Sequence, residues 1–163
     1  MRVYLIRHAV AFERDRRRWP DDRLRPLTPE GVRRFRKATA GLRSIVKRVD
    51  RVLASPLVRA WDTAVLLHEA AGWPEPEKCA ALAPGRAPPQ VLAALREGKA
   101  TRIALVGHEP DLSRLIAVCV GGPDAKLSIA MKKGGAAHLE FSDEVRPGQA
   151  TLRWLVPPRA LRG

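Results

Sequence analysis

Short apolar runs alternate along the chain with longer segments whose apolar residues recur every three or four positions. The compact runs are rich in valine, isoleucine and leucine, and this composition favours buried strands. Two segments near the end of the chain alternate apolar and polar residues instead, which is typical of an antiparallel pair. The pattern predicts buried strands at 3–6, 51–54 and 102–106, a short strand at 79–82, and an antiparallel pair at 137–141 and 151–156.

The helical segments carry start and stop signals as well as the 3.6-residue period. Thr28 followed by Pro29 predicts an N-cap and a first helical residue. The helix that follows should bury Phe35, Ala38, Leu42 and Ile45. Ser55 and Pro56 should cap a second helix, which Gly72 ends and which should bury Val58, Trp61, Val65 and Leu66. Two further helices are expected, at 88–95 and at 110–121.

This order of elements predicts an α/β fold formed by one domain over residues 1–163. Strands that alternate with helices favour a mostly parallel central sheet with helices on both faces, which makes three layers joined by right-handed crossovers. No linker or internal repeat divides the chain. Ligands of such sheets bind beyond the carboxyl ends of the strands.

Composition excludes several classes of protein. The two cysteines, Cys79 and Cys119, are too few for a disulfide framework, and no apolar run approaches the roughly 20 residues of a membrane span. The run at 3–6 is too short for a secretory signal. We therefore expect a cytoplasmic protein with no membrane partner.

Positive charge is concentrated at the start of the chain. The formal net charge is +13, and residues 1–60 alone carry 17 basic and 6 acidic side chains. Such an excess suits nucleic acid, an anionic membrane or a phosphorylated partner. Because basic residues interleaved with aromatic ones, as in nucleic-acid-binding motifs, do not occur, we expect no nucleic-acid partner.

Three predicted strands end in residues suited to phosphate chemistry. Residues 3–6 lead into Arg7 and His8, residues 102–106 lead into His108, and Arg59 follows the strand at 51–54 by one helical turn. If these strands are neighbours, two histidines and two arginines meet at one edge of the sheet. His68 and His138 lie within a predicted helix and a predicted strand, so we assign them structural roles.

Four motifs occur in the order in which a known family carries them. Together they resemble the histidine phosphatase (phosphoglycerate-mutase-like) superfamily, and the short chain is similar to its SixA-type phosphohistidine phosphatases. The motifs are LIRHA at 5–9, LTPEG at 27–31, SPLVRAWDTA at 55–64 and VGHEP at 106–110.

The resemblance implies a phosphoglycerate-mutase-like fold and a covalent phosphohistidine on His8. Arg7, Arg59 and His108 would then bind the phosphoryl oxygens, and no cofactor or metal would be needed. A nucleophilic imidazole must be neutral, and the charges of Arg7 and Arg59 should lower its pKa. Its second nitrogen should donate to a carbonyl or carboxylate. Glu109 is a possible general acid, or else a carboxylate that favours the start of a helix.

The substrate that the resemblance favours is phosphohistidine on a signalling protein, such as a histidine phosphotransfer domain. The alternatives are a small-molecule phosphomonoesterase of the same superfamily and a non-catalytic module that binds phosphate or polyphosphate.

Two basic segments could contribute to any of these sites. Arg14, Arg16, Arg17 and Arg18 lie in the loop after His8 and could steer a substrate, and residues 132–134 are expected near the edge of the site.

Overall fold

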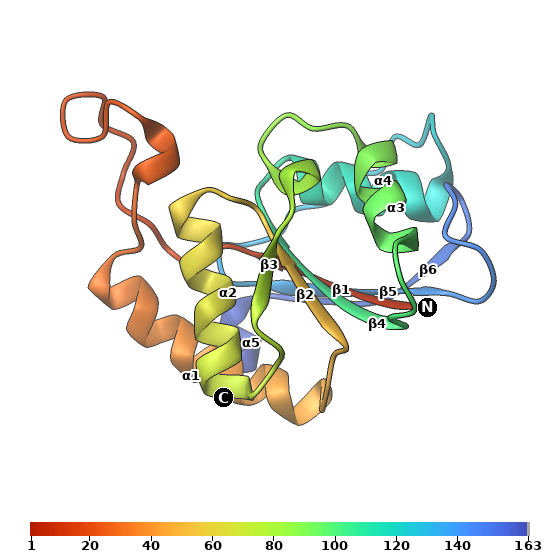
Figure 1. Cartoon of the computed structure of the whole chain (residues 1–163), viewed down its shortest axis with the longest axis horizontal. Coiled ribbons are helices and arrows are strands. Elements are labelled where there is room, and N and C mark those ends of the chain that lie inside the picture. Colours follow the sequence, from red (N-terminus) through yellow and green to blue (C-terminus); the bar gives the residue numbers. More distant parts are fainter. Residues whose placement is uncertain (163) are drawn as a thin grey trace.

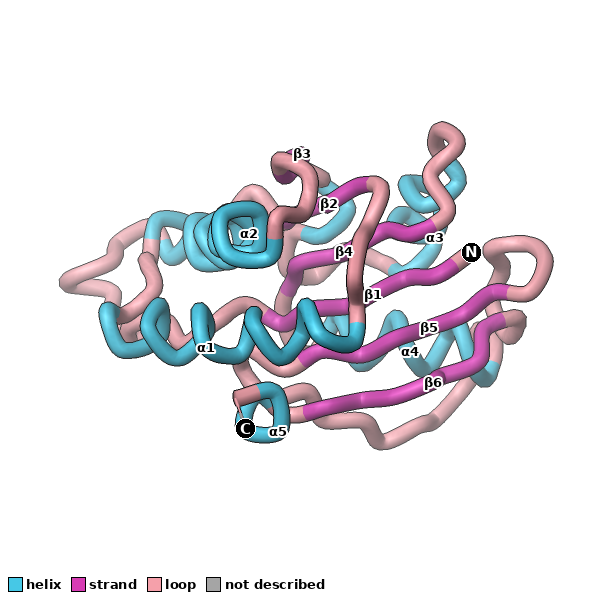
Figure 2. Tube along the Cα trace, turned by 90° about the horizontal axis from the view of Figure 1, so that it is seen from below, coloured by secondary structure: helices cyan, strands magenta, loops and turns pink. Residues whose placement is uncertain are grey.

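Six strands form one mixed sheet in the computed structural model, which describes residues 1–162. The spatial order is β3-β2-β4-β1-β5-β6, in which β3, β2, β4 and β1 are parallel and β5 and β6 are antiparallel to their neighbours (Figures 1 and 2). The strands are β1 (Arg2–Arg7), β2 (Arg51–Ala54), β3 (Pro76–Lys78), β4 (Arg102–Gly107), β5 (Ala136–Phe141) and β6 (Ala150–Val156).

Helices cover both faces of this sheet, as the sequence predicts. One layer contains α1, α2 and α5, and the other contains α3 and α4 (Figure 1). Their bounds are α1 (Pro29–Ile45), α2 (Val58–Ala71), α3 (Pro88–Arg96), α4 (Asp111–Gly121) and α5 (Pro158–Leu161). None of the helices within residues 1–162 has the length and apolar character needed to cross a membrane.

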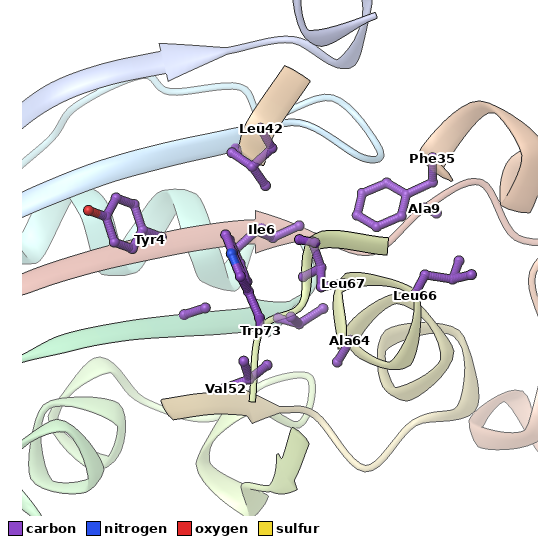
Figure 3. Packing of buried hydrophobic residues seen from close by; sticks show 14 of the residues in the cluster. Tyr4, Ile6, Ala9, Phe35, Leu42, Val52, Ala64, Leu66, Leu67 and Trp73 are labelled. Carbon is purple, nitrogen blue, oxygen red and sulfur yellow. The ribbon is translucent and has the colours of Figure 1, made fainter. Parts of the chain in front are cut away.

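Strand alternation divides the core into two halves. On β1, Tyr4 and Ile6 pack under α1 and α2, whereas Val3 and Leu5 face α3 and α4. Figure 3 shows the first half, where Ile6 lies near Trp73 and Leu67. With apolar residues on both faces, β1 and β4 are buried along most of their length, which fits the continuous apolar runs of parallel strands.

The predicted start of the first helix is confirmed in detail. Thr28 caps α1, because its side-chain oxygen accepts a hydrogen bond from the Gly31 N–H at 2.9 Å, and Pro29 is the first helical residue. Phe35, Ala38 and Leu42 are buried as expected. The prediction for Ile45 is wrong: it is 52% exposed, because the buried face of the last turn continues from Leu42 to Val46 and Ile45 lies outside that face.

Two other local predictions are also wrong. The short strand lies at Pro76–Lys78 rather than at 79–82, and it pairs with β2 over only these three residues. The predicted segment 79–82 instead contains a 3₁₀ turn at Ala80–Leu82. On α2, Leu66 is buried as predicted, but Val58, Trp61 and Val65 are only partly buried. The other buried apolar positions are three alanines, Ala60, Ala64 and Ala71, together with Leu67. Small side chains let α2 approach the sheet and α1 closely, and a pattern of large apolar residues does not reveal that.

Candidate active site

The sheet topology brings the three predicted strand ends together. β4 lies between β1 and β2, and Arg7 is level with Gly107 while Ala54 is level with Val106. His8, Ser55 and His108, which directly follow these strands, therefore lie at one edge of the sheet. The rings of His8 and His108 have centroids 5.2 Å apart. The side chains are largely enclosed, with His8 at 6%, Arg59 at 5% and His108 at 3% exposure.

His8 has one ring nitrogen committed to the backbone. Its Nδ1 lies 2.7 Å from the carbonyl oxygen of Ala9. Because a carbonyl can only accept, Nδ1 carries the proton, and the Nε2 of the neutral ring carries the lone pair. The N–H of the same residue is held by Thr63, whose Oγ1 accepts the Ala9 N–H at 3.0 Å and donates to the Arg59 carbonyl at 2.7 Å.

The surroundings of His8 keep its ring neutral. Burial lowers the pKa of His8 to about 4, and the positive charges of Arg59 and Arg7 act in the same direction. The sequence predicted that the pKa of His8 is lowered and that Arg7 and Arg59 contribute to this. Burial is the larger cause, and it could not be assigned before the fold was known.

Arg7 and the segment before β5 form one wall of the site. Arg7 Nη1 donates to the Met131 carbonyl at 2.6 Å. The Gly134 N–H points at the carbonyl oxygens of Arg7 and His8, at 3.1 and 3.0 Å. Residues 132–134 thus lie beside His8, as predicted, and the charge of Lys133 also lowers the pKa of His8.

Asp22 fixes the position of Arg59, a contact that the sequence predictions did not include. Arg59 Nη2 lies 3.2 Å from the Asp22 carboxylate, and Nη1 donates to the Asp22 carbonyl at 2.9 Å. The same carboxylate pairs with Arg25 at 2.8 Å and with Arg14 at 3.5 Å. Burial opposes ionisation, but the hydrogen bond from Arg25 and the charge of Arg59 outweigh it and hold the pKa of Asp22 below its usual range. In the sequence, the only sign of this contact is that Asp21 and Asp22 stand together in a segment rich in arginine.

Ser55 contacts His108 and does not cap α2, so that prediction is wrong. The N-cap of α2 is Leu57, two residues later, and it has no side-chain cap. Ser55 Oγ accepts the Leu57 N–H at 3.4 Å and lies 2.8 Å from His108 Nε2. When the Ser55 hydroxyl donates to Nε2, the proton of a neutral His108 ring lies on Nδ1 and can be donated to an oxyanion. Burial and the charge of His8 lower the pKa of His108 to about 3, so the ring is neutral near pH 7.

Three buried nitrogens at this edge have no hydrogen-bond partner among residues 1–162: Arg7 Nε, Arg59 Nε and His108 Nδ1. Buried donors are rarely left unpaired, because each such group costs about 1–3 kcal/mol. Each of these three nitrogens belongs to a residue that the sequence analysis predicts to bind the phosphoryl oxygens. A group of donors that carries two positive charges is suited to a tetrahedral oxyanion.

Glu109 is occupied by hydrogen bonds at the start of α4. Its Oε1 accepts from the Ser113 hydroxyl at 2.6 Å and from the Met131 N–H at 3.0 Å. Glu109 thus connects the start of α4 to Met131, whose carbonyl accepts the hydrogen bond from Arg7. The geometry fits the expected carboxylate at a helix start, and its charge lies close enough to Arg7 to oppose the lowering of the Arg7 pKa by burial.

The remaining predicted residues lie outside this group. Arg14, Arg16, Arg17 and Arg18 are exposed on the loop that extends away from the body of the molecule before the 3₁₀ turn at Asp22–Leu24 (Figure 1). His68 and His138 are structural, as predicted: the former bonds the Trp73 carbonyl through Nδ1 at 2.7 Å, and the latter stacks on Tyr4.

The chain belongs to the histidine phosphatase superfamily (branch 1), whose family model matches residues 3–83. An uncharacterized protein of Picosynechococcus sp. is 30% identical to it over 96% of this chain and 100% of the relative. Another, from Mycobacterium tuberculosis, is 33% identical over 86% of this chain and 96% of the relative.

Solved structures extend the comparison to the whole fold. The protein histidine phosphatase SixA complexed with tungstate matches with a TM-score of 0.82 and 25% identity, over 99% of each chain. The alpha-ribazole phosphatase of Shigella flexneri matches with a TM-score of 0.74 and 21% identity, over 97% of each chain, and so shares the fold. The expected fold and family are confirmed.

Proposed function

We propose that the chain is a phosphohistidine phosphatase that uses His8 as its nucleophile. The observation that carries the proposal is the set of three unpartnered buried donors, on Arg7, Arg59 and His108, next to an imidazole whose lone pair is on Nε2. The similarity to SixA, which was solved with the oxyanion tungstate, supports the same reading.

In the first step, the lone pair of His8 Nε2 attacks phosphorus while the bond from phosphorus to the leaving group breaks. The leaving group keeps the bonding electron pair and takes up a proton from solvent water. Arg7, Arg59 and His108 Nδ1–H would donate to the phosphoryl oxygens, where fixed donors stabilise the loose transition state. In the second step, water attacks the phosphorus of phospho-His8. The electrons of the phosphorus–nitrogen bond return to Nε2, and inorganic phosphate leaves with the oxygen of that water.

The substrate preference follows from the position of Glu109. Its oxygens accept hydrogen bonds from Ser113 and Met131, so it is poorly placed to donate a proton to a leaving group. The imidazole of a phosphohistidine has a basic nitrogen that can take up a proton before the bond to phosphorus breaks, whereas the bridging oxygen of a phosphomonoester is hardly basic and needs an acid to protonate it as it leaves. We therefore propose phosphohistidine on a signalling protein as the substrate, with a histidine phosphotransfer domain as the partner.

The test compares wild type with His8→Ala on a peptide phosphorylated at histidine and on para-nitrophenyl phosphate, with Arg43→Ala as the control. Arg43 is an exposed residue near the end of α1, away from the site. We expect His8→Ala to abolish phosphate release from both substrates, and wild type to prefer the peptide. A preference for small phosphoesters would instead identify a small-molecule phosphomonoesterase. Tight phosphate binding without turnover would identify a binding module.

A further inference from the structure

A cavity of about 180 Å³ adjoins the candidate site on the side of α1. It opens between the start of α1, the segment before β5 and the end of the chain, where α5 packs beside α1 (Figure 2). Ala9, the neighbour of His8 in the chain, forms part of its wall, as does Gly134, whose N–H bonds the His8 carbonyl. The cavity and the candidate site therefore share the backbone at Ala9 and Gly134, so one extended substrate could reach both. We call it the flanking cleft.

The flanking cleft is positively charged. Arg34, Lys133 and Arg162 line it, and no acidic residue does so within residues 1–162. The nearest negative charge in contact with these cations is Glu30, which pairs with Arg34 from one turn earlier in α1. Phe35 and Pro158 provide apolar surface between the cations. The Arg34 side chain is 58% exposed, so an ion pair formed in the cleft would be a solvent-exposed one.

The size of the cleft limits what it can hold. Cavities that bind whole small molecules are commonly about 300–1,000 Å³. The flanking cleft is smaller, and it suits one or two side chains that belong to a larger substrate. Its charge selects carboxylates among those side chains.

We propose that the flanking cleft binds an aspartate or glutamate next to the phosphorylated residue, so that the enzyme prefers phosphohistidine within an acidic segment. This inference rests on the proposed function and adds to it the chemistry of the sequence around the phosphohistidine. The carboxylate would pair with Arg34 or Arg162 while the phosphoryl group reaches His8.

The experiment uses two peptides that carry one phosphohistidine and differ only in its neighbours, which are glutamates in one peptide and glutamines in the other. The cleft variant is Arg34→Gln/Arg162→Gln. The control variant, Arg43→Gln/Lys47→Gln, removes the same number of charges from exposed positions near the far end of α1. The kcat/KM ratio of the two peptides is measured at low ionic strength for all three proteins.

Wild type and the control should favour the acidic peptide by about fivefold to tenfold, the effect of one or two solvent-exposed ion pairs. The cleft variant should lower that ratio toward one. A wild-type ratio near one, or an unchanged ratio in the cleft variant, would overturn the inference. An equal loss in the control would also overturn it, because overall charge would then explain the preference. If wild type released phosphate from both peptides at equal rates, the proposed phosphatase function would be supported and the role of the flanking cleft would be refuted. If it released no phosphate from either peptide or from para-nitrophenyl phosphate, both proposals would be refuted.

Discussion

Replacing Thr63 by valine should loosen Ala9, the residue whose carbonyl orients the His8 ring. Thr63 is fully buried, and its Oγ1 is the partner of the Ala9 N–H, which lies in a residue only 1% exposed. Valine keeps the shape of threonine but cannot accept that hydrogen bond. The buried Ala9 amide would then be unpaired, which costs about 1–3 kcal/mol. Since 1 kcal/mol shifts the Tm of a domain of this size by roughly 2–4 °C, we expect a decrease of about 4–8 °C for a loss near 2 kcal/mol.

The same change should lower activity, because the Ala9 carbonyl accepts the Nδ1 proton of His8. If the backbone of Ala9 can shift, its carbonyl no longer fixes the ring, so kcat should fall while KM changes little. Thermal denaturation and steady-state kinetics on para-nitrophenyl phosphate measure the two effects. Thr63→Ser is the matched control, since it keeps the hydroxyl and loses one methyl group. If Thr63→Val matched wild type in stability, or matched Thr63→Ser in kcat, the link from Thr63 through Ala9 to His8 would be refuted.

Three further predictions concern protonation and reactivity. The pKa values of His8 and His108 lie near 4 and 3 in the folded protein and near 6.5 when unfolded, so only the unfolded chain takes up these protons as pH falls from 6.5 toward 4. The free energy of unfolding should therefore fall by about 2 kcal/mol per histidine between pH 7.5 and pH 5, and equal urea midpoints at the two pH values would contradict this. Ser55→Ala should lower kcat by on the order of tenfold to a hundredfold, because His108 loses the partner that keeps its proton on Nδ1; an unaltered kcat would remove Ser55 from the account. Burial raises the pKa of Cys119 to about 12, so a thiol reagent at pH 8 should modify Cys79 alone in the native protein and both cysteines in denaturant, as counted by mass spectrometry.

The sequence predicted the parts of the fold that depend on local pattern. Apolar runs located the central strands, and Thr28 with Pro29 located the start of α1 because capping chemistry is local. Once β1 and β4 are neighbours, the positions of His8 and His108 follow from the register of the strands. For this reason the residues at the strand ends could be found without coordinates.

Features that depend on packing between distant segments were not predictable in this way. Alanines form much of the buried face of α2, and hydrophobicity does not distinguish a buried alanine from an exposed one. Asp22 and Arg59 are 37 positions apart, and their contact depends on how the arginine-rich loop returns to α2. Ser55 resembles an N-cap in sequence, and only the position of His108 shows its actual partner.

The most direct test of the central claim is to trap the phosphorylated enzyme. Wild type is mixed with acetyl phosphate, quenched in alkaline detergent, which preserves phosphohistidine, and mapped by mass spectrometry. We expect an acid-labile phosphate on His8 of the wild type that is absent from His8→Ala. Continued turnover by His8→Ala, or a phosphate that maps to another residue, would contradict it.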